Sequence, residues 1–156
     1  MPLLTDTEIS ALISEKKPLP ENYQAMLQTR PKRGHSEKEI EISGTDGSIF
    51  TILLRQNIIN PLDFSAILAY NIPKTNVLFR LCRYNGKSHE HTNKIEQEKF
   101  YTFHIHQATE RYQLLGLRED SFAVPTDRYA ELQQAIRCLI EDCNFILPIN
   151  SQLSWV

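Results

Sequence analysis

The amino-acid sequence predicts a two-layer α+β domain, in which N- and C-terminal helices pack on one face of an antiparallel sheet of four to five strands. Three observations predict this fold class. Apolar residues recur at helical spacing near both ends of the chain, they alternate with period two across its middle, and short turns join the middle segments. Strands joined by short turns pair antiparallel, which leaves the terminal helices to cover one sheet face.

The N-terminal third predicts two helices and a loop. Thr5 and Glu8 stand at capping-box spacing, and apolar residues follow them at i, i+3 and i+4, which predicts a helix over about 5–16. The sequence ENYQAMLQT, 21–29, indicates a second short helix. The segment RPKRGHSEK, 30–38, lacks periodicity and is expected to form a polar, basic loop.

The middle of the chain predicts the sheet. GTDG and NIPKTN are typical turn sequences between strands. A longer connection, NGKSHEHTNKIEQE, precedes the last predicted strand. The predicted strands are KEIEIS (38–43), SIFTILLRQ (48–56), LDFSAILAY (62–70), VLFRLCRY (77–84) and KFYTFHIH (99–106).

The C-terminal third begins with residues 107–125, which are expected to be irregular or to form short elements. The segment TDRYAELQQAIRCLIEDCN has the clearest apolar stripe in the chain and predicts a helix over about 127–143, capped by Thr126 or Asp127. The apolar tail after it is expected to pack as a final extended segment.

Composition limits the classes of function. The 156 residues fit a single domain, 1–156, and the net charge of −2 gives no general attraction to nucleic acid or anionic membrane. The apolar stretches are too short to span a bilayer, and the first residues do not resemble a signal peptide, so no membrane association is expected. Three cysteines without a C-x-x-C argue against disulfides and thiolate zinc sites, and favour a cytoplasmic location.

Histidines supply the main candidate for function. Four of the five lie within residues 88–107, as the pairs His89/His91 and His104/His106. In KFYTFHIH, period two places Tyr101, Phe103 and Ile105 toward the core and both histidines on the opposite, open face. The same alternation in VLFRLCRY places Arg80 and Tyr84 beside them.

One hypothesis for this surface is metal-independent cleavage or binding of RNA. His104 and His106 would transfer protons near neutral pH, Arg80 would contact the phosphate, and Tyr84 would donate a hydrogen bond or stack on a base. Such a toxin-like ribonuclease needs no cofactor and would have an inhibitor or antitoxin protein as partner. Additional contacts to RNA would come from basic residues outside the histidine segment, Arg30, Lys32, Arg33 and Arg111.

A second hypothesis is a zinc or iron site. Its ligands would be drawn from His89, His91, His104 and His106, with Glu96 or Glu110 as a further candidate. The stretch HEHTNKIE resembles the first cupin motif in the spacing of His89, His91 and Glu96. The glycines and the second motif of that family are missing from this sequence.

A third hypothesis is a non-enzymatic binding module whose protein partner docks on the open sheet face, with surface histidines clustered by chance. No phosphate-binding loop, dinucleotide-binding glycine motif or serine-hydrolase motif occurs in the sequence. The sequence leaves these three hypotheses open and does not specify the oligomeric state.

Overall fold

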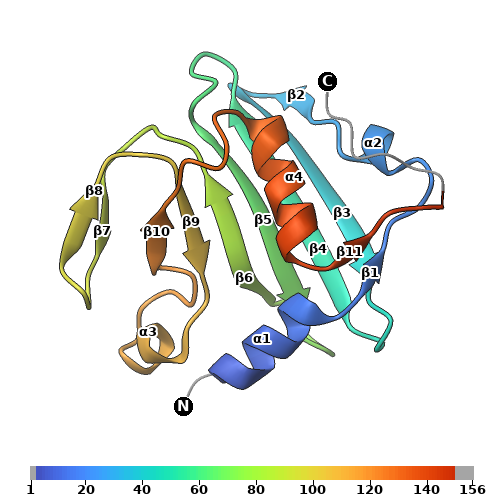
Figure 1. Cartoon of the computed structure of the whole chain (residues 1–156), viewed down its shortest axis with the longest axis horizontal. Coiled ribbons are helices and arrows are strands. Elements are labelled where there is room, and N and C mark those ends of the chain that lie inside the picture. The colour runs from blue at the N-terminus through green and yellow to red at the C-terminus, as the bar shows by residue number, and fades with distance from the viewer. Residues whose placement is uncertain (1–2, 150–156) are drawn as a thin grey trace.

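A computed structural model describes residues 3–149 and has the predicted α+β architecture (Figure 1). A seven-stranded antiparallel sheet forms one layer. Helix α4 (Leu132–Asp142) lies across one face of this sheet, and α1 (Asp6–Ser14) lies near the end of the sheet where β6 begins. In spatial order the strands are β10 (Ala123–Pro125), β9 (His104–Gln107), β6 (Leu78–Asn85), β5 (Phe64–Asn71), β4 (Ile49–Asn57), β3 (His35–Ser43) and β2 (Arg30–Lys32).

The N-terminal helix begins as the sequence predicts. The Thr5 hydroxyl accepts a hydrogen bond from the Glu8 N–H at 3.1 Å, and the Glu8 carboxylate accepts one from the Thr5 N–H at 3.0 Å. These two bonds satisfy backbone donors that the first helical turn leaves unpaired. The second predicted helix is also present, as α2 (Tyr23–Met26).

The C-terminal helix begins later than predicted, at Leu132, and neither Thr126 nor Asp127 caps it. The Thr126 hydroxyl instead accepts a hydrogen bond from the Arg128 N–H at 3.2 Å, which stabilises a local turn. The Tyr129 hydroxyl lies 2.7 Å from the Asn85 carbonyl oxygen and 2.9 Å from that of His104. These contacts hold residues 127–131 against the sheet instead of in a helix.

The sheet is wider than the predicted four to five strands. The segment expected to be a basic loop forms β2 and the start of β3, which turn at Gly34 with a φ of +72°. The region after residue 107 contributes α3 (Glu110–Leu114) and the edge strand β10. Short strands within polar segments have too few apolar residues to show a period, which explains why the sequence pattern did not reveal them.

The predicted strand 99–106 is split in two. Its first part, β8 (Glu98–Phe100), pairs with β7 (His91–Asn93) in a separate hairpin, and only β9 joins the main sheet. Between them Phe103 packs on Phe64 and Tyr129, with ring centroids 6.2 and 5.7 Å apart. Tyr101, expected in the core, is 56% exposed.

The hydrophobic core lies between α4 and the sheet. Residues of β4 and β5 that alternate toward α4, including Phe50, Ile52 and Leu68, are almost completely buried there. A short parallel pair, β1 (Lys17–Pro18) with β11 (Phe145–Ile146), joins the two ends of the described chain. The expected extended tail is seen in β11, and residues 150–156 lie outside the described part. Every helix within residues 3–149 is too short and too polar to cross a membrane.

Candidate metal centre

Two of the predicted site residues, His104 and His106, point away from α4. In the antiparallel pair of β6 and β9, His104 lies opposite Asn85 and His106 lies opposite Arg83. Ile105, between them, lies opposite Tyr84 and packs on the core under α4. The predicted direction of both histidines is therefore confirmed. The part of this face that they occupy is not open to solvent, however, because His104 is only 5% exposed and His106 only 3%.

Tyr84 lies on the other side of the sheet from these histidines, which corrects the sequence prediction. In the β5–β6 pair Leu68 lies opposite Cys82 and Ala69 lies opposite Arg80, so Leu81 is an extra residue in a β-bulge. The bulge reverses the alternation after Arg80. Arg80 therefore shares the histidine face as predicted, whereas the Tyr84 hydroxyl donates to the Asp142 carboxylate of α4 at 2.6 Å.

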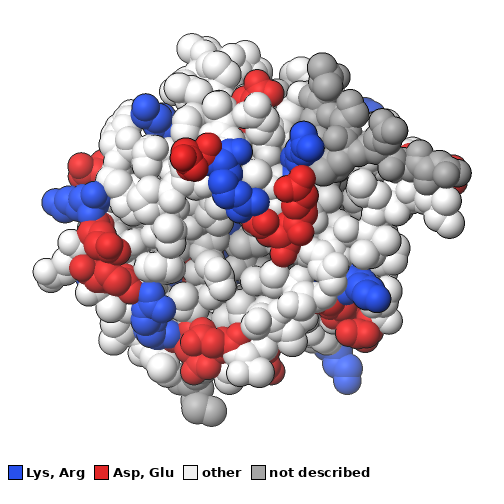
Figure 2. All heavy atoms as spheres, viewed as in Figure 1, with Lys and Arg blue, Asp and Glu red and all other residues white. Residues whose placement is uncertain are grey.

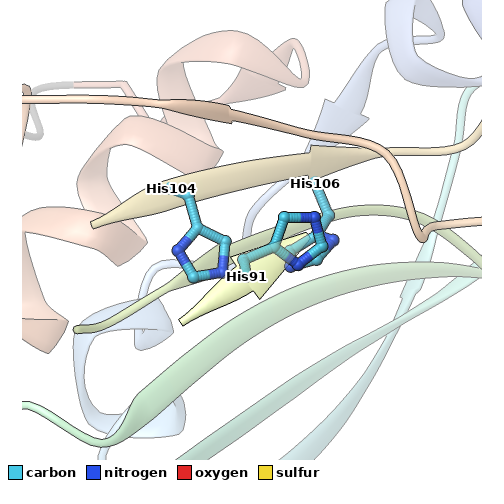
Figure 3. Close-up of side chains that lie close together, drawn as sticks. All are labelled: His91, His104 and His106. Carbon is cyan, nitrogen blue, oxygen red and sulfur yellow. The ribbon is translucent and has the colours of Figure 1, made fainter. Parts of the chain in front are cut away.

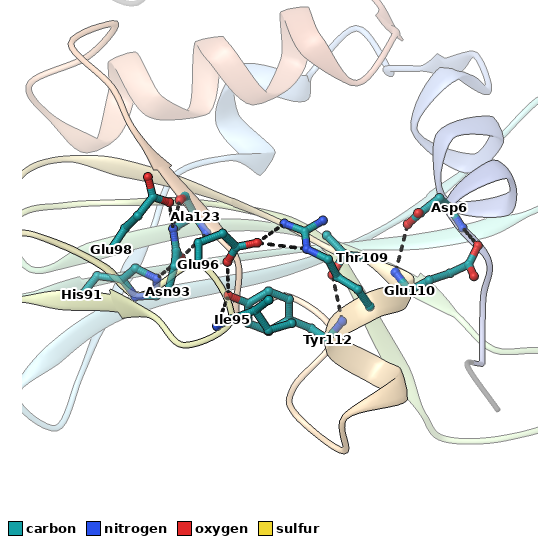
Figure 4. Close-up of polar contacts among 11 residues, drawn as sticks. Asp6, His91, Asn93, Ile95, Glu96, Glu98, Thr109, Glu110, Tyr112 and Ala123 are labelled. Atoms are coloured by element: carbon teal, nitrogen blue, oxygen red, sulfur yellow. Dashed lines mark hydrogen bonds and ion pairs between the residues drawn. The ribbon is translucent and has the colours of Figure 1, made fainter.

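The β7–β8 hairpin brings a third histidine, His91, to this face. The side chain of Asn93, the last residue of β7, mimics a strand by pairing with the Ala123 backbone. Its Oδ1 accepts from the Ala123 N–H at 2.9 Å, and its Nδ2 donates to the Ala123 carbonyl at 2.7 Å. At the hairpin turn, the Tyr112 hydroxyl donates to Glu96 at 2.6 Å (Figure 4). These contacts hold the hairpin, and with it His91, in place.

His91, His104 and His106 converge, with one ring nitrogen from each lying within 4.8 Å of the others (Figure 3). Their ring centroids are 4.8 to 5.2 Å apart. Nitrogen ligands of one tetrahedral zinc ion lie about 3.4 Å from one another, given zinc–nitrogen bonds of about 2.0–2.1 Å. Small side-chain rotations would thus bring the three nitrogens to ligand distance.

Hydrogen bonds determine which nitrogen of each ring carries the proton. Nδ1 of His104 lies 2.8 Å from the Thr102 carbonyl oxygen, and Nδ1 of His106 lies 2.7 Å from that of Asp120. A carbonyl oxygen can only accept, so both Nδ1 atoms donate and both Nε2 atoms keep a lone pair. His91 donates from Nε2 to Asn93 Oδ1 at 2.7 Å, which leaves the lone pair on its Nδ1.

Burial keeps two of these imidazoles neutral. It lowers the pKa of His104 to about 4, mainly because the charged ring would lose its hydration. The same cause, reinforced by the nearby Arg83 guanidinium, lowers the pKa of His106 to about 2. Both rings are therefore unprotonated near pH 7, the state in which imidazole binds metal ions.

Other predicted ligands lie outside the cluster. His89 is exposed and contacts Ser88, so it is not one of the converging histidines. Glu96, the third residue of the cupin-like spacing, accepts hydrogen bonds from Arg111 and Tyr112 instead. The Glu110 carboxylate accepts a bond from the Asp6 N–H. The structure thus selects three of the four predicted histidines and neither glutamate.

The predicted RNA contacts are scattered. Arg30, Lys32 and Arg33 lie on or beside β2, at the far edge of the sheet, and four strands separate β2 from β9. At about 4.8 Å per strand this distance is about 24 Å. Arg111 is on α3 and pairs with Glu96. On the face that carries α4, basic and acidic side chains are interspersed and not sorted by sign (Figure 2).

Three residues outside the predicted set of site residues orient the cluster. Asn93 and Asp120 accept the histidine N–H bonds, and Asn85 places its Nδ2 3.4 Å from Nε2 of His106. Asn85 Oδ1 is buried without a hydrogen-bond partner. The spacing of His91 and Asn93 was the one available signal, because side chains two apart on a strand share a face.

Comparison with known proteins identifies a family without a described activity. Residues 4–147 match a family described as "Family of unknown function (DUF6978)". No curated protein and no solved structure matches the chain.

Proposed function

We propose that this chain, which belongs to the DUF6978 family of unknown function, is a metal-binding protein in which His91, His104 and His106 hold one zinc or iron ion. One observation carries the proposal. Each of the three rings donates one N–H to an oxygen acceptor, and one nitrogen of each ring lies within 4.8 Å of the other two. Metal-binding histidines characteristically have such an acceptor behind them, which fixes the tautomer and the ring orientation.

The ligand set favours a site with an open coordination position. Imidazole suits zinc, iron, copper and nickel, and three histidines with a fourth position left for water or substrate are typical of catalytic zinc. No thiol takes part, because all three cysteines are buried elsewhere in the core. A bound divalent ion would supply Lewis-acid chemistry at the open position.

Proton transfer to RNA is supported less well by this geometry. A histidine acid–base pair works best with pKa values near the operating pH. The pKa values of His104 and His106 are lowered to about 4 and about 2, and the hairpin covers both rings. RNA cleavage or binding by His104, His106 and Arg80 remains a prediction, whereas Tyr84 cannot contribute from the opposite face.

A chance cluster is also supported less well, because His104 and His106 are buried and His91 is half-buried. Exposed imidazoles cost little, but burying polar rings has a free-energy cost unless their nitrogens find partners. Asn85 Nδ2 lies 3.4 Å from Nε2 of His106, a long contact. A metal ion would satisfy one nitrogen of all three rings at once.

The test is metal binding by the full chain purified without a histidine tag. We expect about one zinc or iron per chain by elemental analysis, and a visible absorption spectrum when Co²⁺ is added to the metal-free protein. His91→Ala should abolish stoichiometric binding. His89→Ala is the matched control, because His89 belongs to the same pair but lies outside the cluster. Equal metal binding by the two variants, or none by the wild type, would contradict the proposal.

A further inference from the structure

A buried carboxylate, Asp120, lies between three guanidinium groups beside the histidine cluster. Its side chain is fully buried, and its Oδ2 lies 3.1 Å from Arg83 Nε and 3.5 Å from Arg80 Nε. Its Oδ1 lies 3.6 Å from Arg118 Nε. Glu119 adds one more carboxylate, 3.5 Å from Arg80 Nη2. Three positive charges therefore face two negative charges, which leaves an excess of one positive charge.

The ion pairing of these groups is incomplete. Among the residues that the structure describes, neither oxygen of Asp120 accepts a hydrogen bond, and the buried Nε–H groups of Arg80 and Arg83 donate none. Arginine has five N–H donors in a planar fork, so two carboxylates cannot saturate three such groups. The arginine side chains are partly exposed, at 31% for Arg80, 19% for Arg83 and 55% for Arg118. The unpaired Nε–H groups are themselves buried, so a dissolved ligand would contact the exposed parts of these side chains.

The arginine cluster adjoins the proposed metal position. Arg83 lies directly opposite His106 on the same sheet face, and the Asp120 carbonyl accepts the His106 N–H. On the next strands of the sheet, Ile67 of β5 lies opposite Arg83, and Leu53 of β4 lies opposite Ile67. These two residues belong to the apolar part of a hollow of about 260 Å³, whose other lining residues include Glu37, Glu39, Arg55 and Ser65. One row thus runs from this hollow through Arg83 to His106, over about 15 Å at about 4.8 Å per strand.

We propose that Arg80, Arg83 and Arg118 bind the oxyanion of a small organic ligand, a phosphate or carboxylate group, that also reaches the metal held by the histidines. The inference rests on the proposed function, because the metal supplies the ligand's second contact. Guanidinium forks match both oxyanions through paired N–H donors. The uncharged part of the ligand lies over Ile67 and Leu53. The proposed ligand is therefore a carboxylic acid or a phosphate ester that carries an apolar group.

The experiment is calorimetric titration of the zinc-loaded full chain with inorganic phosphate and, separately, with acetate at constant ionic strength. The tighter of the two identifies the oxyanion class. We expect Arg83→Met to weaken binding by about tenfold or more, as loss of a charge-assisted hydrogen bond implies. Arg118→Met, at an exposed position that does not threaten folding, should weaken it less but measurably. The matched control is Arg137→Met, because Arg137 is an exposed arginine of α4, on the opposite side of the sheet, and pairs with Glu141.

Two results would overturn the inference: neither anion binds the wild type, or Arg83→Met and Arg118→Met bind as tightly as Arg137→Met. The same titrations on metal-free protein separate this failure from failure of the metal proposal. Zinc binding without any anion binding removes only the arginine site. Phosphate or acetate binding that depends on Arg83 in a protein that binds no zinc supports the arginine site and removes the metal centre.

Discussion

Two groups of buried basic nitrogens in this fold differ in how fully they are satisfied. Lys17 is 0% exposed, and its ammonium group donates to the carbonyl oxygens of Leu12, Ile13, Glu15 and Cys143 at 2.7 to 2.9 Å. In the histidine cluster, His104 and His106 are buried and His91 is half-buried, and one ring nitrogen of each lies within 4.8 Å of the others. The lysine has all its protons bound by the protein, whereas the one hydrogen bond described for the second ring nitrogens of the histidines is long, at 3.4 Å from Asn85 Nδ2 to His106 Nε2.

This difference separates a structural role from a binding role. Leu12, Ile13 and Glu15 belong to the end of α1, and Cys143 follows α4, so Lys17 satisfies carbonyls that helix ends leave unpaired. It thereby connects the two terminal helices through the β1–β11 pair. Within residues 3–149, the second ring nitrogens of the clustered histidines make only the long contact to Asn85. Buried polar groups that the protein itself leaves unsatisfied point to a ligand, and those that it satisfies point to stability.

The largest expected effect is a loss of folding stability in acid, caused by protonation of the histidine cluster. The folded pKa values of His104 and His106, about 4 and about 2, lie below the ordinary 6.5, so the unfolded chain binds protons that the folded chain does not. Stability present at pH 7 is therefore lost as the pH falls from 6.5, by about 1.4 kcal/mol per pH unit for each ring. Between pH 6.5 and 4 the two rings together remove up to about 7 kcal/mol.

Urea titrations of the metal-free protein at several pH values measure this loss. His104→Leu should reduce the slope of stability against pH below pH 6.5, because one of the two titrating rings is gone. His89→Ala should keep the wild-type slope, since His89 is exposed. A His104→Leu slope equal to that of the wild type would show that burial does not disfavour the charged ring.

Removing the lysine contacts should have the next largest effect. Lys17→Met preserves the aliphatic stem but leaves four carbonyl oxygens without a donor. We expect a loss of about 3–5 kcal/mol in the free energy of unfolding, since each buried unsatisfied group costs about 1–3 kcal/mol and the residues relax in part. Urea denaturation measures it, with Lys16→Met, at an exposed position, as control. Equal midpoints for the two variants would refute the structural role of Lys17.

Metal should stabilise the fold through the histidines alone. Free zinc at 100 times its Kd adds about 2.7 kcal/mol. For a domain of this size that corresponds to a rise in Tm of about 5–10 °C. Calorimetry should show the rise for the wild type and for Lys16→Met, and no rise for His106→Ala. A similar rise in His106→Ala would indicate that zinc binds elsewhere.

The direction of His104 and His106 was predictable because alternation along one short strand determines it. Four of the five predicted strands correspond to single strands of the main sheet, and the fifth is split into β8 and β9. Tyr84 was misplaced because the bulge at Leu81 has no glycine or proline to mark it in the sequence. The position of His91 depends on the contact of Asn93 with Ala123, thirty residues away. The alternation of residues along one strand cannot reveal a contact between segments so far apart in sequence. The burial of the cluster under the hairpin was therefore not predictable either.

Asn93 should have the smallest of these effects, and the most informative one. It accepts the His91 N–H and also pairs with the Ala123 backbone, so it both orients a ligand and holds the hairpin. Loss of such an outer partner costs about 10–100-fold in metal affinity. Asn93→Ala should therefore weaken zinc binding by that factor in competition with a chelator, while Thr92→Ala, at an exposed neighbour, should not.

Asn93→Asp keeps an acceptor for His91 but cannot donate to Ala123. If Asn93 acts by orienting His91, Asn93→Asp recovers most of the zinc affinity while its urea midpoint stays below that of the wild type. If affinity and stability instead fall together in Asn93→Asp, the side chain matters only for docking the hairpin, and the distinction between satisfied and ligand-binding groups does not extend to Asn93.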